Sequence, residues 1–149
     1  METYTEEVGK KLNDLLERTY DAEKGYKNAA ENVKHSGLKN YFNTKAKQRY
    51  DFGHELKNEI KAFGQEVDKG GSVTGALHRA WMDTKALFSS DNEESMLEES
   101  IRGEKAALEE YCQVISETSL PSTTKNVLEK QKSKIEVGLD TIKRLEDTI

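Results

Sequence analysis

The sequence predicts an all-α protein folded as one four-helix bundle over residues 1–149. Proline occurs once in 149 residues, so few breakers interrupt the long segments rich in the helix formers Leu, Ala, Glu and Lys. Apolar residues recur along these segments at the spacing of a helix face. Charged residues make up 34% of the chain, which would also suit a disordered protein, but the regular apolar spacing excludes disorder.

The first helix is expected over residues 4–35. Thr3 and Glu6 have the spacing of a capping box, in which the hydroxyl and the carboxylate each bind a free backbone N–H. Ser36-Gly37 is expected to end this helix, with Gly37 in the left-handed conformation. Because the connection is so short, the next helix must return antiparallel. The apolar stripe contains Leu12, Leu15, Leu16, Thr19, Tyr26, Ala30 and Val33.

The second helix is expected over residues 38–63, with Gly64 as its stop. A shorter helix over residues 73–88 is interpreted as a crossover, because the link from Gly64 to Asp91 is far longer than a tight turn. A helix of that size covers about 20 Å, enough to carry the chain back along much of a bundle. Trp81 is expected to lie outside the core as a lid.

Two further helices, expected over residues 92–118 and 122–148, complete the bundle. Asp91 is a suitable N-cap for the first of them, and Pro121 suits either the turn or the first position of the last helix. Cys112 is expected to be a small buried hydrophobic residue. Two tight hairpins joined by one long middle crossover are typical of a ferritin-like bundle.

Two helices carry a carboxylate within the apolar stripe. Glu23 lies within roughly 20° of the centre of its stripe at 100° per residue, and Glu104 repeats the arrangement beside Ile101. Buried acids are rare unless another group pairs with them. The question for function is therefore what faces Glu23 and Glu104. The alternative is that both lie nearer the stripe edge and reach water.

A dinuclear metal site in such a bundle needs one Glu on each of two helices and Glu-x-x-His on each of the other two. Glu23 and Glu104 occupy the single-glutamate positions. Asp51 and His54 have a similar spacing on the second helix, but Asp51 lies about 180° from the apolar face, so both are expected to be exposed. Leu139 stands where the last helix would need histidine. We therefore expect no metal, no other cofactor and no catalytic residue.

A buried polar network is expected in place of the metal. Arg49 lies 13 residues after Ser36 and Glu23 lies 13 before it, so the two share a level of the hairpin and can form charge-assisted bonds. Removing one member of a buried pair costs about 3–5 kcal/mol, so Glu23→Ala is expected to be more destabilising than Asp51→Ala. The other expected members are Lys45, Glu104, Gln131, Tyr26 and Tyr111.

Charge and composition exclude several classes of function. The net charge is −5 and Lys and Arg alternate with Asp and Glu, so no basic stripe is present and nucleic acid is not an expected partner. A single cysteine excludes an internal disulfide. The acidic start of the chain lacks the apolar stretch of a signal peptide, and no apolar run has membrane-spanning length. We expect a cytoplasmic protein.

Three segments also resemble a known family. They are Gly71 to Asp83, with the sequence Gly-Ser-Val-Thr-Gly-Ala-Leu-His-Arg-Ala-Trp-Met-Asp, residues 102–111 and residues 12–16. Over nearly the whole chain the sequence resembles a bacterial family of ferritin-like four-helix bundles, domain of unknown function 2383. The resemblance implies a bacterial source and a ferritin-like fold, and it implies no activity or catalytic residue. The chain departs from metal-binding ferritin relatives at Arg49, Phe52 and Leu139.

Three functions follow from these observations. The first is a non-enzymatic bundle that acts through its surface, as an interaction or stress-associated module that self-associates or binds another protein. The second is a di-iron or di-manganese oxidoreductase that uses Glu23 and Glu104. The third is a small-molecule pocket under the crossover, for which the alternative is simple coverage of the core. Its residues would be Trp81, Met82 and Phe88.

Overall fold

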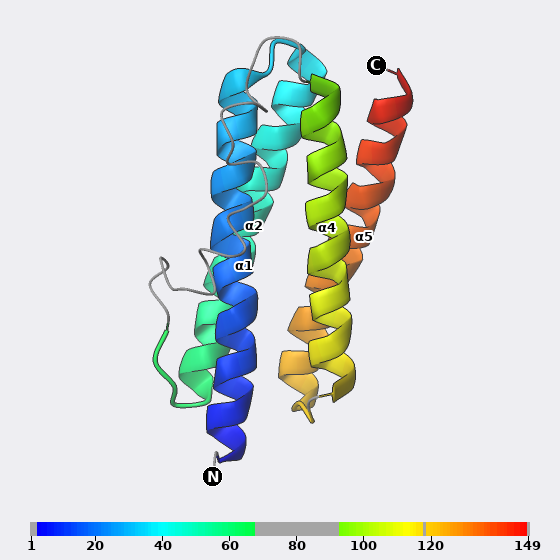
Figure 1. Ribbon diagram of the computed structural model, residues 1–149. Helices are drawn as coiled ribbons and strands as arrows, with labels where there is room; N and C mark the ends of the chain where they lie inside the picture. The colour runs from blue at the N-terminus through cyan, green and yellow to red at the C-terminus, as the bar shows by residue number, and fades with distance from the viewer. Residues whose placement is uncertain (1–2, 68–92, 118, 149) are drawn as a thin grey trace.

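Four long helices packed side by side make up the described part of the chain in a computed structural model (Figure 1). The structure describes residues 3–67, 93–117 and 119–148. The helices are α1 (Tyr4–Asn32), α2 (Ser36–Ala62), α4 (Glu93–Glu117) and α5 (Ser122–Thr148). The predicted all-α four-helix bundle is confirmed. The expected crossover helix over residues 73–88 lies outside the described residues.

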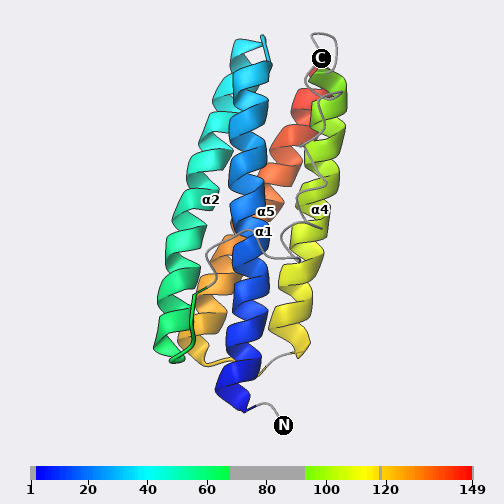
Figure 2. The same ribbon diagram turned by 60° about the vertical axis from the view of Figure 1, so that its left-hand side comes forward.

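The helices form two hairpins, α1 with α2 and α4 with α5, and contacts are far more extensive within each hairpin than between them. Across the hairpins α1 packs against α4, and α2 packs against α5. The two views agree that α2 and α4 therefore lie on a diagonal of the bundle (Figures 1 and 2). A side chain that reaches from α2 to α4 must cross the bundle centre.

The sequence prediction was wrong about the start of α2 and correct about its end. The predicted role of Gly37 is wrong: α1 already ends at Asn32, and Gly37 lies inside α2. The His35 imidazole caps α2 instead, since Nδ1 accepts from the Leu38 N–H at 3.2 Å. A Cβ at position 37 would lie 3.0 Å from the His35 ring, so close approach explains this glycine. At the other end Gly64 has φ +72°, which confirms the predicted stop.

Two clusters of apolar side chains fill the bundle, and they meet at the level of Arg49 and Glu104. One contains Tyr26, Phe42, Leu97 and Ile142, and the other contains Leu12, Leu16, Phe52, Tyr111 and Ile135. Within the described residues no helix combines the length and apolar character that a membrane span requires.

The sequence had predicted a buried face of α4 centred beside Ile101 and containing Cys112, but the buried face lies about one residue earlier along the chain. Its buried positions include the small residues Ser100 and Ala107, and Cys112 is exposed. The prediction of a buried Cys112 is therefore wrong. Small residues thus take buried positions on α4, whereas the apolar Ile101 is only partly buried. Counting large apolar residues alone had placed the centre of the stripe too far along the chain.

Candidate functional site

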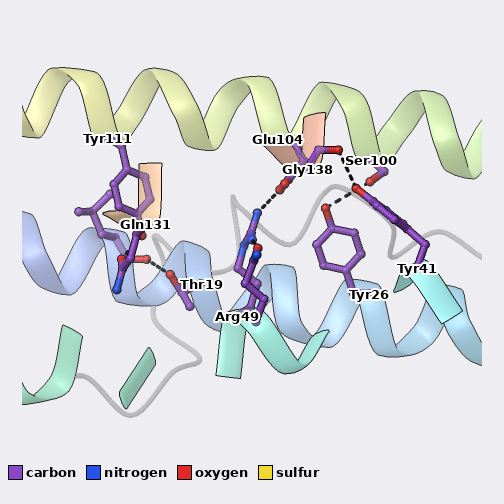
Figure 3. Close-up of polar contacts among 11 residues, drawn as sticks. Thr19, Tyr26, Tyr41, Arg49, Ser100, Glu104, Tyr111, Gln131 and Gly138 are labelled. Carbon is purple, nitrogen blue, oxygen red and sulfur yellow. Dashed lines mark hydrogen bonds and ion pairs between the residues drawn. The ribbon is translucent and has the colours of Figure 1, made fainter. Parts of the chain in front are cut away.

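An ion pair between Arg49 on α2 and Glu104 on α4 crosses the centre of the bundle (Figure 3). Arg49 Nη2 donates to Glu104 Oε1, and the side chains are 2% and 1% exposed. Arg49 Nη1 donates to the Gln48 Oε1 atom of its own helix. Two aromatic rings flank the guanidinium, whose carbon lies 5.7 Å from the ring centre of Tyr26 and 5.3 Å from that of Phe52. Such rings attract a cation through their faces.

The charge of Arg49 is maintained inside the bundle by its surroundings. Burial alone would lower the pKa of Arg49, but the adjacent Glu104 carboxylate, followed by the oxygen of Tyr26, raises the pKa above its ordinary value. Glu104 Oε2 is buried and accepts no hydrogen bond from the described residues. The pair is thus neutral overall. One carboxylate oxygen, however, has lost its hydrating water and gained no hydrogen bond from the described residues in return.

Tyr26 borders the pair on the side of α1. The Ser100 hydroxyl donates to the Tyr26 hydroxyl at 3.3 Å, which joins α4 to α1. Burial, and next the charge of Glu104, raise the pKa of Tyr26 well above its usual range. The phenol therefore stays protonated beside the ion pair, as a neutral polar group.

A second polar group lies further along the bundle and joins three helices (Figure 3). The Tyr111 hydroxyl on α4 donates to Gln131 Oε1 on α5 at 2.5 Å. Gln131 Nε2 in turn donates to Glu55 Oε1 at 3.1 Å and to the Phe52 carbonyl at 3.4 Å, both on α2. Burial raises the pKa of Tyr111. The structure thus brings Tyr111 and Gln131 together, in a polar group separate from the ion pair.

Glu23 does not pair with Arg49, and this expectation requires correction. The Glu23 carboxylate is 18% exposed and lies 2.8 Å from Lys27 Nζ, one turn along α1. Ala22 takes the buried position, and Glu23 lines a surface hollow together with Lys47 and Tyr50. One residue of helix turns the side chain by about 100°. That rotation moves Glu23 from the stripe centre to its edge.

Lys45 is buried on α2, but it is separate from the ion pair. Its ammonium lies against Gly138 of α5, where a Cβ would overlap it, and is 5.6 Å from the ring centre of Tyr41. The Tyr41 hydroxyl donates to the Gly138 carbonyl at 3.0 Å. Burial, and next the positive charge of Arg49, lower the pKa of Lys45.

The sequence analysis missed two buried acids on α1. Glu17 and Asp21 are 1% and 5% exposed, and they lie on the side of the helix roughly opposite to Tyr26 at about 100° per residue. The apolar spacing gives no signal for them, because it marks only the face toward the bundle core. Nearby, Arg18 forms an ion pair with Glu110 of α4.

The side chains at the bundle centre do not fit a dinuclear metal site. Such a site needs carboxylates on all four helices and two histidines, whereas α2 presents Arg49 and Phe52 here and α5 presents Gln131. Asp51 and His54 are exposed, as predicted. Among the described residues no group of three or more His, Cys, Asp or Glu side chains could hold a metal ion.

The proposed pocket under the crossover cannot be placed, because it falls on residues outside the described ranges. These residues are Trp81, Met82 and Phe88.

Comparison with known proteins gives a family match and a set of similar folds. The model of the family described as domain of unknown function 2383 matches residues 7–117. No curated protein matches the chain.

Three solved structures share the fold at low sequence identity. A tetragonal form of Mycobacterium smegmatis Dps has 15% identity and a TM-score of 0.79, covering 93% of this chain and 86% of its own. A variant of Mycobacterium smegmatis Dps1 has 15% identity and a TM-score of 0.81, covering 98% and 99%. A structure described as ferritin-like diiron-carboxylate proteins from Bacillus anthracis str. Ames has 17% identity and a TM-score of 0.74, again covering 98% and 99%.

Proposed function

The chain belongs to the family described as domain of unknown function 2383, and we propose that it is a non-enzymatic ferritin-like bundle that acts through its surface. In this proposal the buried Arg49–Glu104 pair takes the position of a metal site, and the protein needs no metal or other cofactor. It serves in the bacterial cytoplasm as an interaction or stress-associated module, by self-association or by binding another protein, and not by binding nucleic acid.

The position of the Arg49 guanidinium is the observation that carries this proposal. Its positive charge lies on the α2–α4 diagonal and is bonded to Glu104, the one buried glutamate of the expected metal set. Arginine does not lose its proton in proteins, so it would repel a metal cation at this place. The nearby Gln131 amide is already engaged by Tyr111. These contacts support a structural role for the bundle centre.

A second candidate is a di-iron or di-manganese oxidoreductase that uses Glu23 and Glu104. The description of the Bacillus anthracis structure as ferritin-like diiron-carboxylate proteins favours it. Two observations are against this candidate. Glu23 is partly exposed and paired with Lys27, and the Glu104 carboxylate already forms an ion pair with Arg49. Reorganisation of both ion pairs would be needed before the two carboxylates could share an ion.

Elemental analysis separates the two candidates. Protein purified without chelators is expected to hold less than about a tenth of an equivalent of iron or manganese, since a specific site requires a suitable ligand set. The matched control is Glu104→Gln, which removes the central carboxylate and leaves surface carboxylates unchanged. An equivalent or more of metal in the wild type that is lost in Glu104→Gln would establish the oxidoreductase instead.

The mode of action is tested by the oligomeric state. Light scattering across a range of protein concentrations is expected to show a defined assembly larger than one chain. Large apolar side chains exposed at the surface are available for such contacts; among the described residues they are Tyr4, Tyr50 and Val137. A strict monomer at every concentration that also binds no other protein would contradict a role as an interaction module.

A further inference from the structure

A groove runs between α2 and α5 on the outside of the bundle. It consists of two adjoining hollows of about 220 and 400 Å³ that share Gln48 and Lys134 in their walls. Lys45, Ser133 and Val137 line the smaller hollow. This α2–α5 groove is large enough for a small molecule, since ligand sites commonly have volumes of about 300–1,000 Å³.

The α2–α5 groove has an excess of positive charge. Lys45, Lys47 and Lys134 line it, against the single carboxylate of Asp51. Lys47 Nζ already lies 2.6 Å from Asp51 Oδ1, so those two charges offset each other. Lys134 is not ion-paired within the described part of the chain, and Lys45 is not either. The excess is notable because the whole chain has a net charge of −5.

Lys45 is largely buried but has no counterion among the described residues. It is only 8% exposed, yet no described residue forms a hydrogen bond or an ion pair with its ammonium. Glu104, the carboxylate whose charge acts on Lys45, is bonded to Arg49 instead. The ammonium borders the smaller hollow without a counterion from the described part of the protein, and burial of the rest of the side chain removes part of its water. An anion in the smaller hollow would supply the missing partner.

The absence of a side chain at Gly138 of α5 leaves room for the Lys45 ammonium. A Cβ there would overlap Lys45 Nζ and crowd Cε, whereas the Tyr41 hydroxyl would remain at an ordinary 3.7 Å. The glycine thus lets the Lys45 ammonium lie against α5, beside the smaller hollow. Lys45, Lys134 and Val137 all line that hollow. Thr44 and Ser133 also line the groove, and their side chains carry hydroxyl groups that can donate a hydrogen bond.

We propose that the α2–α5 groove binds a small molecule through a phosphoryl group, held by the ammonium groups of Lys45 and Lys134. A phosphoryl group carries a charge of about −1.5 to −2 near pH 7 and several acceptor oxygens. It therefore matches two lysines without counterions and the adjacent hydroxyl donors. The exposed side chain of Val137 provides an apolar contact for the remainder of the molecule.

Titration with two probes tests the proposal. Inorganic phosphate and adenosine monophosphate are each added to the full chain at low salt, and amide chemical shifts are followed by NMR. Saturable shifts are expected for Lys45, Ser133 and Gly138. Tighter binding of the nucleotide identifies an organic phosphate as the ligand, and equal binding identifies the phosphate alone; both support the site. Duplex DNA that binds more tightly than either probe, with the same shifts, would overturn it.

Substitutions locate the binding. Lys45→Met is expected to weaken binding about tenfold or more, because a charge-assisted bond to the anion is lost. Lys134→Met, at an exposed position, is expected to weaken it about fivefold. The matched control is Lys39→Met, which removes an exposed lysine of the same helix outside the groove. Wild-type affinity in both groove variants would overturn the proposal.

Gly138→Ala provides a test that changes no charge. The added Cβ displaces the Lys45 ammonium, while alanine improves helix propensity by up to about 1 kcal/mol, so the variant is expected to fold at least as stably as the wild type. Its affinity for inorganic phosphate should fall severalfold. Unchanged affinity in a folded Gly138→Ala protein would show that Lys45 does not hold the anion.

Discussion

The surroundings of Glu104 on α4 and of Glu23 on α1 differ although both acids lie midway along helices of one bundle. Glu104 faces the opposite helix, is 1% exposed and is bonded to Arg49 across the bundle centre. Glu23 lies at the edge of the seam between α1 and α2, is 18% exposed and is paired with Lys27 of its own helix. The first acid joins two hairpins, whereas the second contacts only a neighbour on the same helix.

This difference shows that the contribution of an acid to stability depends on whether the acid and its partner are both buried. A pair within one helix at the surface contributes about 0.3–0.5 kcal/mol. Removing one member of a buried pair leaves the other as an uncompensated charge, which costs about 3–5 kcal/mol. The two glutamates of this chain are therefore expected to differ by several kcal/mol when they are replaced.

The largest effect is expected from Glu104→Gln. This substitution keeps the shape of the side chain but leaves the Arg49 guanidinium buried without a counter-charge, so the free energy of unfolding should fall by about 3–5 kcal/mol. Urea denaturation followed by circular dichroism measures it. A loss below about 1 kcal/mol would mean that water or another group neutralises Arg49.

A double substitution provides the control for this result. Arg49→Met together with Glu104→Leu replaces both charges with apolar groups of similar size, and such replacements are often neutral or stabilising. The double variant is expected to recover most of the stability that Glu104→Gln loses. Failure to recover would show that the two side chains contribute by something other than their mutual charge.

Alkaline pH should destabilise the bundle through its buried tyrosines. The pKa values of Tyr26, Tyr41 and Tyr111 are raised in the folded state, first of all by burial. Below about pH 10, the pKa of an unfolded tyrosine, both states keep the proton and the stability is unaffected. Above it the unfolded chain loses protons more readily than the folded chain, so unfolding is favoured by up to about 1.4 kcal/mol per tyrosine at pH 11.

Urea midpoints measured from pH 8 to pH 11 test the pH dependence. Tyr50→Phe, at an exposed position, should leave the slope unchanged, whereas Tyr111→Phe should make it shallower. Equal slopes in these two variants would assign the alkaline loss to other groups.

A smaller effect is expected from Tyr111→Phe at neutral pH. The substitution removes the hydroxyl that donates to Gln131 Oε1 and leaves that oxygen buried without a donor, at a cost of about 1–3 kcal/mol. Thermal denaturation beside Tyr50→Phe measures the difference. A stability equal to that of the wild type would mean that Gln131 finds a new donor.

The smallest effect is expected from Glu23→Ala, at about 0.5 kcal/mol or less. The sequence had suggested a much larger loss than for Asp51→Ala, but Glu23 and Asp51 each form a pair with a lysine one turn along their own helix. The two variants should therefore unfold at nearly the same urea concentration. A loss of about 3 kcal/mol or more in Glu23→Ala alone, the cost of breaking a buried pair, would restore the predicted central role of Glu23.

The sequence was informative about helices and about which polar residues are buried, and less so about their partners. The Thr3 hydroxyl accepts from the Glu6 N–H at 3.2 Å, as half of the predicted capping box requires. Arg49, Glu104 and Gln131 are buried as expected. The pairing was not predictable from the level of residues within one hairpin, because Arg49 reaches across a diagonal to a different hairpin.

The amino-acid sequence by itself determined the helices and the family, because helix propensity, caps and apolar spacing act within a few turns of one segment. Only the tertiary structure decided which side of each helix forms the seam. Ala22, Ser100 and Ala107 are buried because small side chains let neighbouring helices approach, and this approach depends on all four helices at once. That choice placed Glu23 at the edge of its seam, Cys112 at the surface and Glu104 opposite Arg49.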